Sequence, residues 1–167
     1  MAPEKNFRLL AQLAHTMPDV LFVVGGSGPE RRAILEAAGD AKNFRLIGEV
    51  SDRPLFYAAL DAFLLPSLHE ALPMTLLEAM STEVSVIASN LEGVASALGS
   101  AGVLVPPDDG RAMANALHQM AASSSRRREL ASEARGRVVN FYDAKKTSAD
   151  ILTIYRKISA TGDFVRG

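Results

Sequence analysis

Cysteine is absent from the 167-residue sequence, which excludes disulfide bonds and thiolate metal sites. A chain without disulfides fits a reducing compartment, so a cytoplasmic location is expected. The sequence also lacks an excess of either charge, since its formal net charge is −1. This balance gives no reason to expect nucleic acid or an anionic membrane as the main partner. Neither a signal peptide nor an apolar run of transmembrane length is recognisable.

Histidine is scarce as well. The three histidines, His15, His69 and His118, are too far apart in the sequence to indicate a metal cluster, so no metal site is expected. Hydrophobic residues make up 48% of the chain, which is ordinary for a globular protein. The length is sufficient for one domain with its own core.

Short β-rich runs alternate with helical patterns along most of the chain. Runs that recur about every 20 residues are typical of βαβ units around a parallel sheet, which predicts an α/β, Rossmann-like sheet flanked by helices. Strands are expected at Val20–Val24, Asn43–Ile47, Ala62–Pro66, Val84–Ser89 and Gly102–Val105. Helices are expected between these strands, at Glu4–Thr16, Pro29–Ala38, Arg53–Leu60, Pro73–Ser81 and Val94–Leu98. The C-terminal part of the domain, residues 108–160, is expected to be helical, with helices at Asp109–Ala121, Arg126–Asn140 and Ala144–Ser159.

Each predicted strand ends in turn residues, such as Gly25-Gly26, Gly48 and Pro66-Ser67. In a parallel sheet these ends share one edge, and open α/β sheets bind their ligands there. The Gly25–Gly28 turn fits neither a P-loop nor the G-x-G-x-x-G fingerprint, because the required lysine and third glycine are missing. We interpret it as a tight turn that lies near a ligand.

The segment HEALPMTLLEAM follows the third predicted strand. It places Glu70 before a helix and Glu78 two turns inside it, about 10 Å away. Pro73 suits the first helical position. The next amides then form an anion site at the positive end of the helix dipole; they belong to Met74, Thr75 and Leu76. An apolar stripe is expected to pack into the core; it consists of Leu72, Leu76, Leu77 and Met80.

These residues resemble the retaining glycosyltransferases of the GT-B fold, the glycosyl transferases group 1 family. The similarity is to the C-terminal, donor-binding half of that fold. It runs through EKNFRLLAQL, FVVGGSGPE, FRLIGEV, FLLPSLHEALPMTLLEAM, SVIASNLEG and GVLVPPDD, in that order. The most specific part is the pair of glutamates with seven residues between them, preceded by Pro-Ser.

The resemblance implies roles for individual residues. Glu70 holds the donor sugar, Glu78 binds the ribose hydroxyls, and Lys5 pairs with the diphosphate. The nucleobase lies along Gly48, Glu49 and Val50. Further contacts to the donor are expected from Ala71, Leu72, Met74, Thr75, Gly25, Gly26, Ser67 and His69, although an exposed His69 without such a role is an equal alternative.

The same resemblance implies a nucleotide-diphosphate sugar as substrate, with no cofactor and no metal required. The chain opens in a helix with no strand before it, so the first strand of the domain and the N-terminal acceptor domain are expected to be missing. An acceptor glycan or lipid-linked sugar would bind through that domain. The resemblance also allows peripheral membrane contact by the full-length protein.

Several positions depart from the family pattern. Ala71 replaces the usual glycine, and Glu83-Val84-Ser85 replaces Gly-x-Pro. The Gly-Gly loop reads Glu92-Gly93, and Ser96 stands where a glutamate is common. Two alternatives therefore stay open: a non-catalytic sugar-nucleotide-binding or regulatory module, and a sugar-nucleotide epimerase of the same fold. Acceptor-dependent turnover by the full-length protein would exclude the non-catalytic module. An epimerase would need its acid/base carboxylates in the N-terminal half, so the full sequence would decide that alternative.

Overall fold

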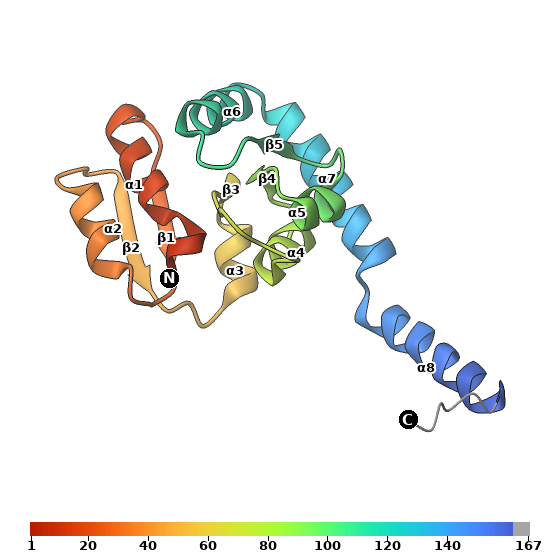
Figure 1. Cartoon of the computed structure of the whole chain (residues 1–167). Coiled ribbons are helices and arrows are strands. Elements are labelled where there is room, and N and C mark those ends of the chain that lie inside the picture. The colour runs from red at the N-terminus through yellow and green to blue at the C-terminus, as the bar shows by residue number, and fades with distance from the viewer. Residues whose placement is uncertain (162–167) are drawn as a thin grey trace.

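The computed structural model describes the backbone of residues 1–161 and the side chains of residues 1–159. It confirms the α/β class, with parallel strands flanked by helices (Figure 1). The strands are β1 (Phe22–Gly25), β2 (Phe44–Gly48), β3 (Ala62–Leu65), β4 (Ser85–Ser89) and β5 (Val103–Val105). The helices are the 3-10 turn η1 (Pro3–Lys5), α1 (Phe7–Thr16), α2 (Arg31–Ala38), α3 (Arg53–Ala58), α4 (Met74–Ser81), α5 (Glu92–Leu98), α6 (Gly110–Ala122), α7 (Ser124–Phe141) and α8 (Ala144–Thr161).

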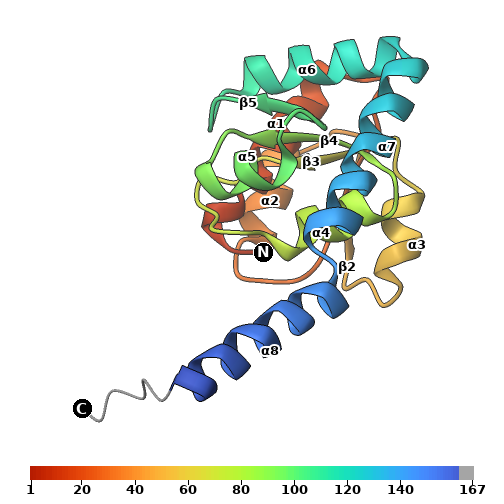
Figure 2. The same ribbon diagram turned by 90° about the vertical axis from the view of Figure 1, so that its right-hand side faces the viewer.

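The strands form two separate parallel sheets. One contains β1 and β2, and the other has the order β3-β4-β5. All five residues of β4 are buried, because strands pair with both of its edges and helices pack on its faces. Such strands are apolar on both faces, and β4 has Val86, Ile87 and Ala88 between two buried serines, Ser85 and Ser89. Figure 2 shows α6 and α4 on opposite sides of these strands.

Helix α6 connects the two sheets. Its buried residues Met113, Leu117 and Met120 pack in one apolar cluster with α1, β1, β2 and Ile87 of β4. A second cluster joins the β3-β4-β5 sheet to α4, α5 and α7. Side-chain caps begin several helices, as the Asp109 carboxylate accepts from the Ala112 amide and the Ser123 hydroxyl from the Arg126 amide.

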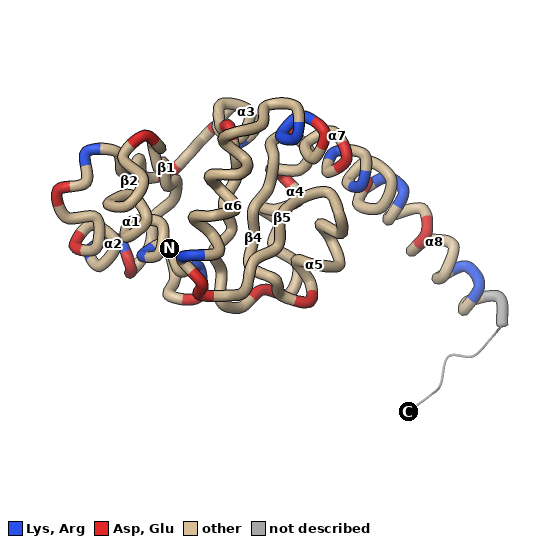
Figure 3. The backbone as a smooth tube through the Cα atoms, turned by 90° about the horizontal axis from the view of Figure 1, so that it is seen from above, with Lys and Arg blue, Asp and Glu red and all other residues tan. Residues whose placement is uncertain are grey.

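The last helix, α8, extends away from the rest of the molecule (Figures 1 and 2). Its side chains from Ala144 to Ser159 are exposed. Acidic and basic residues are interspersed along α7 and α8 (Figure 3), so neither helix presents a long run of one sign. Within residues 1–161, no helix is both long enough and apolar enough to cross a bilayer.

Several predicted helix boundaries differ from the structure by one or two residues, and two of the differences lie beside the predicted site. The continuous helix Glu4–Thr16 is broken at Asn6, which has φ 51° and separates η1 from α1. Asparagine tolerates this left-handed conformation, and its side-chain Nδ2 donates to Asp108 Oδ1 at 3.0 Å. Pro73 is not the first helical residue but the extended residue before it, with ψ 120°.

Candidate functional site

Three loops meet at the carboxyl edge of the strands, where the sequence predicts a ligand. The loop after β1 is joined to the loop after β2, because the Gly26 amide donates to the Gly48 carbonyl at 2.5 Å. The Ser27 hydroxyl adds a bond to Glu49 Oε1 at 2.7 Å. The loop after β3 is attached to η1, because the Leu68 amide donates to the Glu4 carbonyl at 2.8 Å.

Lys5, Ser67 and Glu70 form a compact polar cluster in this region. Glu70 Oε1 accepts from Lys5 Nζ at 2.7 Å and from the Ser67 hydroxyl at 2.8 Å. The Glu70 side chain is only 8% exposed and the Lys5 side chain 36%. The break at Asn6 makes this contact possible, because it ends η1 directly after Lys5 and lets α1 take its own direction. Among the described residues, no hydrogen bond occupies the second carboxylate oxygen, Oε2, which leaves it accessible to a ligand.

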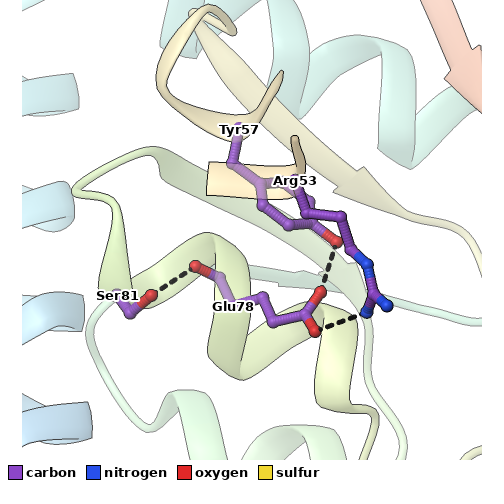
Figure 4. A network of polar contacts seen from close by, with 4 residues as sticks. All are labelled: Arg53, Tyr57, Glu78 and Ser81. Carbon is purple, nitrogen blue, oxygen red and sulfur yellow. Dashed lines mark hydrogen bonds and ion pairs between the residues drawn. The ribbon is translucent and has the colours of Figure 1, made fainter. Parts of the chain in front are cut away.

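Glu78 belongs to a second network, shown in Figure 4. Its Oε1 accepts from Arg53 Nη1 at 2.8 Å, and its Oε2 accepts from the Tyr57 hydroxyl at 3.0 Å. Arg53 and Tyr57 are four residues apart on α3 and therefore lie on one helix face. Burial, followed by the hydrogen bond to Glu78, raises the pKa of Tyr57 above its usual range. Tyr57 thus remains a hydroxyl donor that orients the carboxylate.

The amino end of α4 lies between these two carboxylates. The Leu76 amide, predicted to be a free donor, bonds the Pro73 carbonyl at 3.1 Å because Pro73 is extended and its carbonyl closes the first turn. The amides of Met74 and Thr75 are the first two of the helix and have no intrahelical partner. Both residues are exposed, so an anion has access to these donors.

Leu72 corrects another prediction. It is 45% exposed, whereas Leu76, Leu77 and Met80 are buried as expected. Leu72 precedes the extended Pro73, so the helical periodicity that would place it in the core does not apply to it. Met74, the first residue of α4, is also exposed, at 64%.

An open cleft of about 470 Å³ lies against the Lys5–Glu70 pair. It is lined by Glu4, Lys5, His69, Glu70, Ala71, Leu91 and Glu92. His69 is exposed. Gly93 fixes one wall of this cleft, because a Cβ added to it would lie 1.3 Å from the Ala71 carbonyl oxygen. Only glycine permits this approach of α5 to the loop.

The structure thus brings Lys5, Ser67 and Glu70 into contact, and Gly26 with Gly48. It places Val50 against Gly25, where an added Cβ would lie 2.7 Å from Val50 Cγ2. Sequence reasoning missed Arg53 and Tyr57 as partners of Glu78; their four-residue spacing in a predicted helix was the available signal. In the described part of the chain, no three His, Asp or Glu side chains are grouped so that they could hold a metal ion.

Comparison with known proteins gives a family match over most of the chain. The profile of the family described as "Glycosyl transferases group 1" matches residues 1–123. A phosphatidyl-myo-inositol mannosyltransferase from Mycolicibacterium smegmatis is 35% identical over 159 residues, which are 92% of this chain. The chain spans 41% of the length of that relative.

Solved structures show the same fold. TarM from S. aureus, solved in complex with fondaparinux, alpha-GlcNAc-glycerol and UDP, superposes with a TM-score of 0.85 at 21% identity, over 93% of this chain and 34% of TarM. The C-terminal domain of a glycosyl transferase group 1 family protein from Francisella tularensis superposes with a TM-score of 0.73 at 23% identity. In that case the match covers 86% of this chain and 83% of the other.

Proposed function

The chain belongs to the glycosyl transferases group 1 family, and from this premise we propose that it is the donor-binding domain of a glycosyltransferase. Its ligand is a nucleotide-diphosphate sugar. The full-length protein transfers a hexosyl group from that donor to a hydroxyl of a glycan or lipid-linked acceptor, with retention of the anomeric configuration. The relative that acts as a phosphatidyl-myo-inositol mannosyltransferase supports an acceptor of the lipid-linked type.

The observation that carries this proposal is the order of the polar groups along α4. Glu70 lies before the helix, the free amides of Met74 and Thr75 begin it, and Glu78 lies inside it. A sugar–diphosphate–ribose ligand has the same order of chemical groups. The sugar hydroxyls bond Glu70, the diphosphate takes the amides at the positive end of the helix dipole, and the ribose hydroxyls bond Glu78.

The remaining predicted residues complete the site. The nucleobase lies along Gly48, Glu49 and Val50, in the loop that hydrogen bonds join to Gly26 and Ser27. Arg53 and Tyr57 hold the Glu78 carboxylate from one side and leave its remaining lone pairs for the ribose. His69 and Ala71 line the cleft at the sugar end.

Catalysis in this proposal is mainly electrostatic. As the bond from the sugar to the diphosphate breaks, negative charge develops on the leaving phosphate oxygens. The Lys5 ammonium and the α4 amides stabilise that charge, and Glu70 fixes the orientation of the sugar. Because a lysine and a helix dipole supply the positive charge, we propose that no metal or other cofactor is required.

The acceptor site lies outside this domain in the proposal, so the isolated chain binds the donor but does not transfer the sugar. A thermal-shift screen of nucleoside diphosphates and their sugar derivatives tests donor binding. A ligand at about 100 times its dissociation constant should raise the free energy of unfolding by about 2.7 kcal/mol. The E78Q variant serves as the matched control and should respond less. If none of the nucleotides stabilises the protein, the proposal fails.

A further inference from the structure

The cleft beside Glu70 is acidic. Its lining includes the carboxylates of Glu4, Glu70 and Glu92 and one ammonium, that of Lys5. The Lys5 charge is already compensated, because its Nζ lies 2.7 Å from Glu70 Oε1. Among residues 1–159, the side chains of Glu4 and Glu92 form no ion pair. Two negative charges in this cleft are therefore left without a positive partner.

Glu92 is held beside Glu70 by the backbone that follows it. It is the first residue of α5, and the next residue is Gly93, where an added Cβ would lie 1.3 Å from the Ala71 carbonyl oxygen. The start of α5 therefore lies directly against the residue that follows Glu70. The helix dipole favours an acidic residue in this first turn as well. That effect does not depend on which sugar occupies the cleft, so ligand affinities separate it from a role in recognition.

Glu4 reaches the same cleft from a different element. It lies in η1, and its carbonyl accepts from the Leu68 amide at 2.8 Å, which attaches η1 to the loop that contains Glu70. The same loop meets α5 at Ala71. Glu4 and Glu92 therefore stand on two elements that are both fixed to one short loop, and the carboxylate of Glu70 projects from that loop into the cleft between them.

Glu70 supplies a buried acceptor to the cleft. Its side chain is 8% exposed, and its Oε1 accepts from Lys5 Nζ and from the Ser67 hydroxyl. Among the described residues, no hydrogen bond occupies its Oε2. A carboxylate oxygen accepts from a neutral hydroxyl, but hydrogen bonds from a charged donor are about twice as strong. Burial strengthens this difference, because the local dielectric constant is lower than in water.

We propose that Glu4 and Glu92 make this cleft selective for a donor whose sugar carries a protonated amino group, that is, a nucleotide-diphosphate amino sugar. The inference rests on the proposed function, which places the sugar at Glu70. When Lys5 turns to the diphosphate, the ammonium group of the sugar takes its place among the three carboxylates. A neutral sugar leaves these carboxylates without a positive partner, and a uronic acid sugar adds a further negative charge.

The size of this selection follows from exposure and salt. Glu4 and Glu92 are both exposed, and an ion pair open to water changes affinity by up to about fivefold. Together with the buried Glu70, they should favour an amino sugar over the neutral sugar by about tenfold. Because exposed charges are screened by ions, the preference should fall as the ionic strength rises.

The test is a calorimetric comparison of UDP-glucosamine, UDP-glucose, UDP-glucuronic acid and bare UDP, at about pH 7, where most of the sugar amine carries its proton. The ligands share one nucleotide, so its contribution cancels in the affinity ratios. We expect UDP-glucosamine to bind about tenfold more tightly than UDP-glucose, and UDP-glucuronic acid to bind more weakly than either. E92Q should reduce the first ratio by up to about fivefold, and E4Q/E92Q should reduce it further. The matched control is E133Q, at an exposed position of α7, which should leave the ratio unchanged.

Binding of bare UDP with equal affinities for UDP-glucosamine and UDP-glucose would overturn this inference and leave the donor site itself in place. A preference for UDP-glucosamine that E4Q/E92Q leaves unchanged would overturn it as well, because the two exposed carboxylates would then play no part in the selection. If none of the four ligands binds, the inference fails together with the donor site on which it rests.

Discussion

Lys5 Nζ lies 2.7 Å from Glu70 Oε1 although 65 residues separate the two in sequence. The pair joins the 3-10 turn η1 to the loop after β3. In the proposed function, Lys5 must turn from Glu70 toward the diphosphate when the donor binds. The proposal therefore predicts that the ion pair orients both side chains and that Lys5 exchanges its contact with Glu70 for contacts with the diphosphate.

The close approach of Gly93 to Ala71 predicts opposite effects for two glycine-to-alanine substitutions. In G93A the new methyl group overlaps the Ala71 carbonyl, so we expect a loss of about 1–3 kcal/mol in the free energy of unfolding. In G136A the methyl group meets nothing within 4 Å on helix α7, so a gain of up to about 1 kcal/mol is expected. Urea denaturation measures both. A G93A protein as stable as the parent would show that the cleft wall is not fixed in this way.

Tyr57 is predicted to act on the nucleotide through Glu78. The Y57F variant keeps the ring contacts with Phe56 and Phe63, at centroid distances of 5.7 and 5.5 Å, but loses the hydrogen bond to Glu78. A bond of this kind contributes about 1 kcal/mol, so nucleoside diphosphate affinity should fall by about fivefold in calorimetry. The matched control is Y155F on the exposed helix α8, which should leave the nucleoside diphosphate affinity unchanged. Unchanged affinity in Y57F would remove Tyr57 from the site.

The raised pKa of Tyr57 also predicts how stability depends on pH. The unfolded tyrosine loses its proton near pH 10, whereas the folded one, held by burial and by Glu78, keeps it to higher pH. Stability from this group is thus complete below about pH 10 and is lost as the pH rises. We expect the free energy of unfolding to fall more steeply above pH 10 in the parent than in Y57F. Parallel curves would contradict this assignment.

The sequence predicts those parts of the fold and the site that depend on residues close together along the chain. The alternation of apolar runs and helices and the turn residues at strand ends are local, and they predicted the elements and the edge that carries the site. The break at Asn6 was missed because it depends on a contact with Asp108, about a hundred residues away. The extended conformation of Pro73, which exposes Leu72, was missed because a proline can stand either as the first residue of a helix or as the extended residue before it.

The Lys5–Glu70 pair was beyond sequence reasoning, since no periodicity relates such distant charges. For Glu78, the four-residue spacing of Arg53 and Tyr57 indicates a shared helix face, but not that this face meets α4. The resemblance suggested what each group binds, but not that Lys5 and Glu70 bind each other. The split of the strands into two sheets was likewise hidden from the sequence. Register and pairing are set by tertiary packing.

Glu83 gives a stability prediction at a position where the family pattern has glycine. Its φ of 58° is left-handed, which disfavours a side chain by about 1 kcal/mol or more. In E83G the strain is removed, but the unfolded chain gains conformational entropy, which partly offsets the benefit. We expect a net rise of up to about 1 kcal/mol in the free energy of unfolding. The control E133G, in the middle of helix α7, should lower it by about 0.5 kcal/mol. If both variants lose stability, residue 83 is not strained.

The most direct measurement of the central claim is a calorimetric comparison of two variants with two ligands, a nucleoside diphosphate and the corresponding nucleotide sugar. We predict that E78Q lowers the affinity for both ligands by a similar factor, since both contain the ribose. The lost charge-assisted hydrogen bonds correspond to about 1.5–3 kcal/mol of binding free energy. E70A should weaken only the nucleotide sugar, and it should leave the nucleoside diphosphate unchanged or bound more tightly, because Lys5 is released from Glu70. Equal losses for both ligands in E70A, or unchanged binding of both in E78Q, would contradict the proposed order of sugar, diphosphate and ribose along α4.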